Sequence, residues 1–434
     1  MKASFVIGIT ALSLFVLSNL SCGRGAGFNG KPSIHLQHTI RINTDTITFK
    51  MQNPSSPGVA DCDLTDVKLI RLKMKDSDDV IPGIEKISFF RGKIYCFDLT
   101  REGAVSIFDD NGSFIRKVSR KSRAVPLYKT LLDGRINEGT GNIELVGRNN
   151  NKEALFIQLD SSGGLIGSTQ TKFPGVLNFY AAGSNYFFYK GFQDQAGAIN
   201  TSHRLFSTRY FNLDIKDSYL SYSGKKRTEA AFSFECFSKL STVAGGDTAL
   251  FFENFNDTVY SISSNGLTPR NLVSLVSNKE KPEDFITDNG IKNKTEYLFR
   301  NKMPVLINYI ENDRFVMILF SFVLHSSGSR SVENALFEKS SGKLLIFDNN
   351  RLPARMDSIP FLLDYETFPS LMSQEDGRFV SIIHPDYLLQ RLKEEEMDGR
   401  AAGPIHGFCK KFGLTDLHTN QSPILLLYDL KMNK

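Results

Sequence analysis

Short apolar runs separated by polar turns recur along the whole chain, and they predict β-strands rather than helices. In four places an apolar run, a polar turn with glycine and a further apolar stretch follow one another, with turn glycines at Gly112, Gly163, Gly266 and Gly342. Glycine supplies the positive φ that a tight β-hairpin needs. The first three glycines are 51 and 103 residues apart, so another turn is expected near residue 214, where the glycine is missing.

A second set of six hairpins precedes these turns, and each leads into a strand that is apolar on both faces, such as 185–189 or 315–320. Such strands lie in the middle of sheets that are stacked between other sheets. Four-stranded antiparallel sheets repeated around an axis form a β-propeller. The sequence therefore predicts an all-β fold, a six-bladed β-propeller of four-stranded antiparallel blades. An open solenoid and a two-sheet sandwich are the alternatives.

The strand count leaves one outer strand missing, because the last blade ends with its third strand at 423–431. An apolar strand at 66–74 lies upstream of the first hairpin and has no partner of its own. We expect 66–74 to pair with 423–431, which closes the ring through the two ends of the chain.

The N-terminus has the pattern of a bacterial lipoprotein signal. One lysine precedes an apolar run that is too short for a membrane span, and small residues then lead to Cys22. We expect residues 1–21 to be removed and Cys22 to carry the lipid, with 22–60 as a tether and 61–434 as the propeller. Ordinary cleavage to a soluble periplasmic protein is the alternative. No acidic residue follows Cys22 directly, which favours the periplasmic side of a membrane.

Composition excludes several other classes of protein. Hydrophobic residues make up 41% of the chain and aromatic residues 11%, as in a folded protein. Lys and Arg outnumber Asp and Glu by only 52 to 47, a balance too slight for nucleic-acid binding. The sequence has no Trp, which excludes propellers whose blades depend on that residue.

Four cysteines follow Cys22 in the sequence: Cys62, Cys96, Cys236 and Cys409. Cys96 and Cys236 lie in apolar runs, where a cysteine acts as a small buried hydrophobe, and the sequence leaves any disulfide pairing open. No spacing typical of a zinc site is present. The "HGFC" stretch at 406–409 is expected to be a loop, and 385–403 is expected to be the only helix, inserted into the last blade.

Connections from second to third strand, and from fourth strand to the next blade, open on one face of a propeller, and here they are long. We call this face the long-loop face and the opposite one the short-turn face. Binding residues often lie on loops that a rigid scaffold presents. Two basic clusters lie in long-loop connections and are candidates for an anionic ligand such as an acidic glycan or a lipid headgroup; solvated loops are the alternative. They are Arg120, Lys121 and Arg123, and Lys225, Lys226 and Arg227.

Catalytic candidates are few. Glu85, Asp133 and Glu311 lie near the ends of inner strands, where a central Ca²⁺ could gather oxygen ligands. The sequence fixes no geometry among them. The histidines of the long connections have no identifiable serine or cysteine partner, so the sequence gives no support to nucleophilic catalysis.

The chain resembles a known family, the six-bladed β-propeller lipoproteins of Gram-negative gut anaerobes, a domain of unknown function. The resemblance covers about 60–434 and rests on "KIYCFD" at 93–98, "FDDNGSFIRKV" at 108–118, "FNDTVY" at 255–260 and "SPILLLYDLK" at 422–431. It implies a propeller in the cell envelope and no established activity. The stretch "SRKSRAVPLY" at 119–128 lacks the glycines that the family usually has there.

The sequence therefore favours an envelope-anchored binding or scaffold lipoprotein that uses its long-loop face, and it favours a non-enzymatic role over catalysis. Its expected partners are the membrane, through the lipid, and a glycan or an envelope protein. The alternative is a Ca²⁺-dependent lactonase or glycan hydrolase with a site at the propeller axis, and Ca²⁺ is expected as a cofactor only in that case.

Overall fold

A computed structural model gives the architecture of the chain. The described residues are 36–43, 62–74, 83–119, 128–149, 151, 154–170, 176, 178–190, 203–209, 215–221, 240–242, 248–253, 256–276, 305–323, 330–347, 352–356, 359–363, 371–372, 377–397, 399, 403–417 and 422–432.

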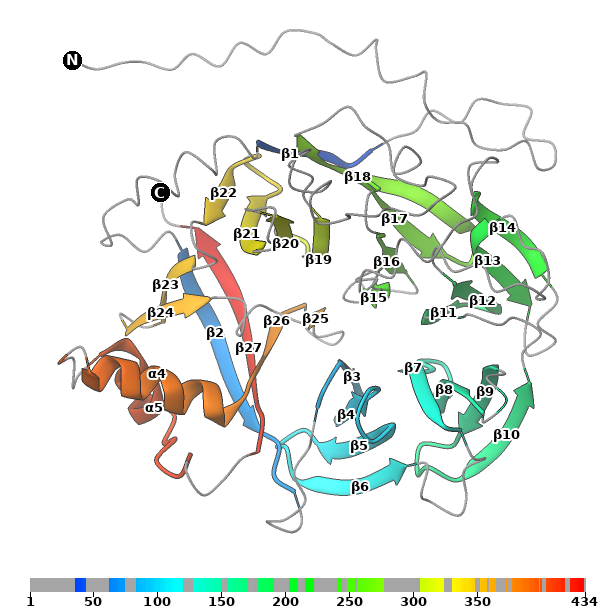
Figure 1. The fold of residues 1–434 in the computed structure, drawn as a ribbon, viewed down its shortest axis with the longest axis horizontal. Helices are drawn as coiled ribbons and strands as arrows, with labels where there is room; N and C mark the ends of the chain where they lie inside the picture. The colour runs from blue at the N-terminus through cyan, green and yellow to red at the C-terminus, as the bar shows by residue number, and fades with distance from the viewer. Residues whose placement is uncertain are drawn as a thin grey trace, which may run out of the picture.

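The strands form a six-bladed β-propeller of four-stranded antiparallel blades, as predicted (Figure 1). In each blade the first strand lies nearest the axis and the fourth lies at the rim. Blades 1 to 3 are β3 (Lys86–Phe90), β4 (Lys93–Asp98), β5 (Ala104–Asp109) and β6 (Phe114–Ser119); β7 (Thr130–Ile136), β8 (Ile143–Arg148), β9 (Ala154–Leu159) and β10 (Leu165–Gln170); β11 (Asn178–Ala182), β12 (Asn185–Tyr189), β13 (His203–Arg209) and β14 (Ile215–Ser221).

Blades 4 to 6 complete the ring. They are β15 (Leu240–Thr242), β16 (Ala249–Phe251), β17 (Thr258–Ser263) and β18 (Gly266–Val276); β19 (Val305–Glu311), β20 (Phe315–Val323), β21 (Arg330–Glu338) and β22 (Leu344–Phe347); β25 (Leu371–Met372), β26 (Phe379–Ile383), β27 (Ile424–Met432) and β2 (Cys62–Arg71).

The two ends of the chain close the ring. The upstream strand β2 pairs antiparallel with β27, from Cys62 opposite Met432 to Arg71 opposite Ile424, with a register shift between Thr65 and Lys68. The predicted closure is thus confirmed, although the upstream strand begins a few residues before 66.

Two blades are wider than predicted. The strand β1 (His38–Asn43) adds to the outer edge of blade 4 by pairing in parallel with β18. The hairpin of β23 (Leu352–Met356) and β24 (Ile359–Leu363) adds to the outer edge of blade 6, where β23 pairs in parallel with β2. Residues 38–43 lie within the segment that the sequence analysis predicts to be a tether.

Burial follows the position of a strand in its blade. All five residues of β12 are buried, as expected for a strand that is apolar on both faces. The rim strand β10 is mostly exposed. The hydrophobic clusters lie between neighbouring blades; for example, Phe156 of blade 2 meets Phe179 and Tyr186 of blade 3 edge-on, with ring centroids 5.6 and 5.4 Å apart. Burial of these apolar faces holds the blades together.

The four turn glycines all have the predicted positive φ, from 70° to 112°. Three of them also lie against the outer strand of the preceding blade. A Cβ on Gly112 would come 2.1 Å from the Arg71 carbonyl oxygen, one on Gly163 would come 2.4 Å from Val118, and one on Gly266 would come 2.8 Å from Tyr219. Gly342 has nothing within 4 Å of that position. The repeated glycine therefore serves blade packing as well as turn geometry.

The insertion in blade 6 holds two helices where the sequence predicts one. The first, α4 (Pro385–Met397), lies in the predicted helix 385–403. The second, α5 (Pro404–Lys411), includes the "HGFC" stretch, so the prediction of a loop there is wrong. Among the helices of the described residues, none is both long enough and apolar enough to cross a membrane.

A side chain from α4 caps the N-terminus of α5. The N-cap of α5 is Gly403, which offers no side chain to the exposed N–H groups. Glu395 of α4 supplies the cap instead, because its carboxylate accepts hydrogen bonds from the N–H groups of Ile405 (2.9 Å) and His406 (3.2 Å). A Cβ on Gly403 would come 2.3 Å from that carboxyl carbon.

Candidate functional site

The predicted ligand and anchor residues lie outside the part of the chain that the structure describes. These are Cys22, Arg120, Lys121, Arg123, Lys225, Lys226 and Arg227. The described strands nevertheless fix where the two basic segments begin. One follows Ser119, the last residue of β6, and the other follows Ser221, the last residue of β14. Both strands are outermost strands that lead into the next blade, so both segments start on the long-loop face.

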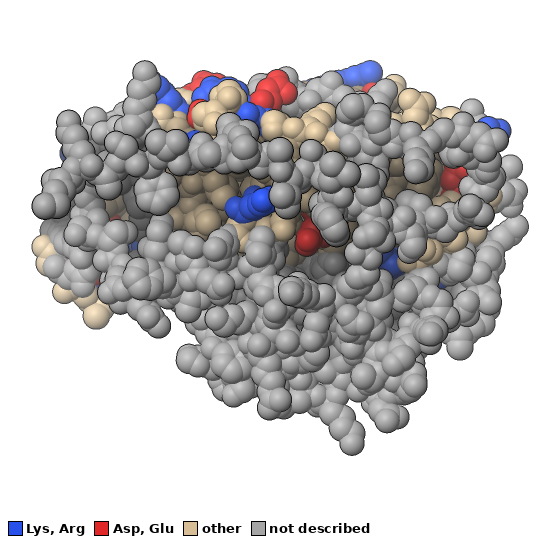
Figure 2. Space-filling model, turned by 90° about the horizontal axis from the view of Figure 1, so that it is seen from above, with Lys and Arg blue, Asp and Glu red and all other residues tan. Residues whose placement is uncertain are grey.

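The described surface of the propeller mixes charges of both signs. Figure 2 views the ring from its rim, and basic and acidic side chains lie interspersed among the described residues there. Some charged side chains of the described residues also pair on the short-turn side of the ring, such as Arg314 with Asp429 at 3.0 Å. Among the described residues, this view therefore shows no large field of one sign.

The three carboxylates proposed for a central site belong to separate networks. Asp133 accepts from Lys86 Nζ of blade 1 (2.8 Å) and, through its other oxygen, from the Phe179 N–H of blade 3 (2.9 Å). Glu85 accepts from the Leu99 N–H (2.8 Å) and from the Thr100 hydroxyl. Glu311 is fully buried beside blade 4. Within the described residues, no group of three or more His, Cys, Asp or Glu side chains could hold a metal ion.

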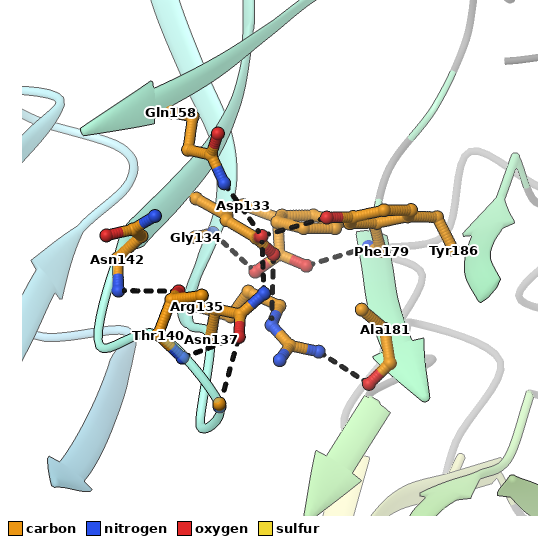
Figure 3. Close-up of polar contacts among 12 residues, drawn as sticks. Asp133, Gly134, Arg135, Asn137, Thr140, Asn142, Gln158, Phe179, Ala181 and Tyr186 are labelled. Carbon is orange, nitrogen blue, oxygen red and sulfur yellow. Dashed lines mark hydrogen bonds and ion pairs between the residues drawn. The ribbon is translucent and has the colours of Figure 1, made fainter. Parts of the chain in front are cut away.

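A buried carboxylate, that of Glu144 near the start of β8, lies between blades 2 and 3 on the side of the short turns. Figure 3 shows its partners Arg135, Asn137 and Tyr186. Oε1 of Glu144 accepts from the Tyr186 hydroxyl and from Asn137 Nδ2, each at 2.9 Å. Its Oε2 faces Arg135 Nε at 3.4 Å, and Arg135 Nη1 donates to the Ala181 carbonyl at 2.7 Å. Burial, and then the Glu144 carboxylate, raise the pKa of Tyr186, so the phenol keeps the proton that it donates.

A second buried carboxylate lies between blades 3 and 4, on the side of the long loops. Glu253 follows β16, and Arg204 of β13 grips it with two parallel hydrogen bonds, Nε to Oε2 at 2.9 Å and Nη2 to Oε1 at 2.6 Å. Asn256 Nδ2 (3.1 Å) and the Tyr189 hydroxyl (3.2 Å) also donate to it. Such a bidentate pair is strong and directional.

A third cluster lies between blades 4 and 5. Glu311 accepts from Arg270 Nε at 2.6 Å and, through its other oxygen, from the Tyr309 hydroxyl at 2.6 Å and Asn271 Nδ2 at 2.9 Å. Lys339 Nζ lies 3.5 Å from the carboxylate. Burial, and then the charge of Glu311, raise the pKa of Tyr309.

The three clusters share one design, a fully buried Glu that accepts hydrogen bonds from a Tyr and an Asn and pairs with an Arg at the junction of two blades. The Tyr hydroxyl of each cluster donates to the carboxylate, and the Arg and Asn side chains also donate to neighbouring groups, such as Arg135 to the Ala181 carbonyl. A buried carboxylate needs such partners because an unpaired charge in the interior is very costly. We therefore assign these clusters to blade docking rather than to chemistry.

The described part of the long-loop face carries positive charge at blade 3. His203 begins β13 and pairs in register with Ser221, which precedes Lys225 by four residues. Burial, and then the charges of Arg204 and Lys190, lower the pKa of His203. Burial is the larger cause of this shift, and the Glu253 carboxylate pairs with Arg204, so the two cations add to the effect of burial on His203.

The cysteines of the described chain are buried. Cys62, Cys96 and Cys409 lie in the hydrophobic clusters between blades and under the helices. Burial raises the pKa of Cys96, and burial together with Glu395 raises the pKa of Cys409 to about 11. Neither thiol is therefore a thiolate nucleophile at neutral pH.

The sequence analysis missed the three clusters because their members are far apart in the chain; Arg204 and Glu253, for example, are separated by 49 residues. One signal was present. The "FNDTVY" stretch supplies both Asn256, which donates to Glu253 and to the Tyr260 hydroxyl, and Tyr260 itself.

The architecture defines a six-bladed β-propeller. The family described as "Domain of unknown function (DUF4934)" matches residues 40–406, and the chain belongs to it. The fold is similar to that of a protein described as exported, from Bacteroides fragilis NCTC 9343, with 14% identity and a TM-score of 0.63 over 91% of this chain and 100% of that chain. A member of the DUF4221 family from Bacteroides vulgatus ATCC 8482 matches with 8% identity and a TM-score of 0.45, over 86% of this chain and 99% of that chain. No curated protein matches.

Proposed function

We propose that this protein is a non-catalytic binding or scaffold lipoprotein of the bacterial cell envelope. Cys22 carries the lipid, and the protein lies on the periplasmic side of the membrane that the lipid enters. The long-loop face binds an anionic ligand, which is an acidic glycan or an envelope protein. The signal-like N-terminus supports export, and the similar solved protein from Bacteroides fragilis is described as exported.

The observation that carries the proposal is the contrast between the two faces of the ring. On the short-turn face the glycine turns of blades 1, 2 and 4 are packed against the preceding blade. On the long-loop face the connections are long, and both basic clusters start at strand ends there. A rigid ring with one closed face and one face of long loops is suited to presenting a binding surface.

The ligand is best sought with mature protein and probes of defined chemistry. Polygalacturonate stands for acidic glycans, and vesicles with and without phosphatidylglycerol test lipid headgroups. An envelope-protein pull-down follows. Saturable binding to one of these probes that is weakened by charge reversal at Arg120, Lys121 and Arg123 supports the proposal. Binding that is unchanged by charge reversal in either basic cluster would contradict it.

Two further measurements separate the parts of the proposal. Mass spectrometry of the mature N-terminus should find an acylated Cys22, and an unmodified first residue other than Cys22 would remove the anchor. Elemental analysis tests the enzymatic alternative, because stoichiometric Ca²⁺ would replace the binding function with a metal-centred one.

A further inference from the structure

The strand β1 does not behave as part of a tether. Ile40 and Ile42 are fully buried in the cluster between blades 4 and 5, together with Val273 of β18 and Phe337 of β21. The His38 ring meets Phe337 edge-on at 5.5 Å. The strand therefore touches two blades at once and fills the wedge between them at the rim.

Backbone hydrogen bonds tie the start of β1 to the buried charge cluster of the same junction. The Gln37 N–H donates to the Arg270 carbonyl at 2.8 Å. The His38 N–H donates to Asn271 Oδ1 at 3.1 Å, and the other end of that amide donates to Glu311 and to the Tyr309 hydroxyl. Residues 37 and 38 are thus held by Arg270 and Asn271, the two residues of β18 whose side chains bind Glu311 of blade 5.

We propose that β1 is a second fastening point that brings the rim at blades 4 and 5 towards the membrane. The inference rests on the proposed anchor at Cys22. The partner surface is lipid, and the part of the protein nearest to it is the edge formed by β1 and β18, which lies across the ring from β5 and β6 (Figure 1).

The length of the chain between Cys22 and the first docked strand limits how far the propeller can lie from its lipid anchor. An extended chain spans at most about 3.6 Å per residue, so the 15 residues from Cys22 to Gln37 reach about 54 Å. Without β1 the first fixed residue is Cys62, and the 40 residues from Cys22 reach about 144 Å. Docking of β1 therefore shortens the reach of the anchor to little more than a third and moves the exit point from blade 6 to the junction of blades 4 and 5.

The charges of the described residues do not oppose the tether in setting this approach. In Figure 2 the ring is viewed from the side on which β1 lies in Figure 1, and the described basic and acidic side chains there are interspersed. A rim of mixed charge gives little net attraction to an anionic bilayer. The contour length up to Gln37 is then the main constraint on distance.

Fluorescence quenching by labelled lipid in vesicles tests the proposal on the acylated full-length mature protein. One dye is placed at Lys343→Cys in the outer turn of blade 5, and another at Asn111→Cys in the outer turn of blade 1; both positions are exposed, and the described thiols are buried. We expect at least twofold stronger quenching at 343 than at 111. The Ile40→Asp variant should remove the difference, whereas Thr39→Asp, on the exposed side of the same strand, should keep it.

A second variant protects the test against misfolding of the Ile40 variant. Forty Gly and Ser residues inserted after Gly30 leave β1 intact but lengthen the reach, and they should also abolish the difference. Equal quenching at 343 and 111 in the parent protein would overturn the proposal. Where mass spectrometry finds no acyl group, coupling through Cys22 to a maleimide lipid keeps the fastening testable, so failure of the anchor and failure of the fastening remain distinct.

Discussion

The two faces of the ring differ in what their connections do. On the short-turn face the turns are brief, and Gly112, Gly163 and Gly266 are in such close contact with the preceding blade that no side chain fits. On the long-loop face the described residues nearest the loops include a buried ion pair, Glu253 with Arg204, and His203, whose pKa is lowered first by burial. The difference teaches that blade docking extends to both faces, whereas the long connections that the proposed ligand site uses leave the ring on one face only.

Removal of the closing strand should have the largest effect. A mature protein that lacks residues 23–75 loses β2, which leaves the apolar strand β27 as an unpaired edge. We expect loss of cooperative thermal unfolding, measured by calorimetry. A protein that lacks only 23–35 keeps every described strand and should unfold like the parent. Cooperative unfolding of the longer truncation at the parental temperature would show that β2 does not close the ring.

Breaking the buried ion pair near the long loops should come next. Glu253→Ala removes the carboxylate that binds the Arg204 guanidinium with two hydrogen bonds, and Arg204 is largely buried. Removal of one partner of a buried pair costs about 3–5 kcal/mol of unfolding free energy. Chemical denaturation checks this value. Glu338→Ala, at the half-buried end of β21 beside an exposed turn, serves as the control, and equal losses for both would contradict the structural role of Glu253.

Two glycine variants test whether the short turns need glycine for blade packing as well as for turn geometry. Gly112→Ala adds a Cβ that meets the Arg71 carbonyl, in addition to the cost of a positive φ; Gly342→Ala has the positive φ but open space around it. We expect about 1–2 kcal/mol of destabilisation for Gly342 and about 1–3 kcal/mol more for Gly112. The two denaturation midpoints give the difference. If they coincide, the glycine repeat serves turn geometry alone.

A histidine variant should have the smallest effect. The pKa of His203 is lowered in the folded protein, so below the unfolded value of 6.5 the unfolded chain binds more protons. Stability therefore rises with pH up to about 6.5 and is level above it. His203→Gln should flatten that slope, measured as denaturation midpoints between pH 5 and 7.5. An unchanged slope would mean that neither burial nor the neighbouring cations disfavour the charged imidazole of His203 in the folded protein.

Most of the fold could be predicted from local patterns in the sequence. The turn glycines, the doubly apolar middle strands and the unpaired strand before the first blade are each visible within about ten residues, and together they predict the ring and its closure. The strand at 38–43 was missed because it has only six residues and because its partner β18 is more than 200 residues away in the chain. Helix α5 was missed because Glu395, on another helix, provides its cap.

The candidate site was less predictable for a similar reason. The buried carboxylates Glu144, Glu253 and Glu311 each depend on donors from a neighbouring blade, so no local spacing announces them. The basic clusters are visible in the sequence as charge runs, but a charge run alone does not separate a binding loop from a solvated one.

Charge reversal on the two faces tests the central claim most directly. Two variants reverse the long-loop clusters, Arg120, Lys121 and Arg123 in one and Lys225, Lys226 and Arg227 in the other; the control reverses Arg91, Lys343 and Lys431, which are exposed at the ends of strands on the short-turn side. Binding to the acidic probe is measured together with the melting temperature. The account predicts at least about tenfold weaker binding, or 1.4 kcal/mol, for a long-loop variant with an unchanged melting temperature, and parental binding for the control. Equal loss for all three variants, or loss for the control alone, would contradict a ligand site on the long-loop face.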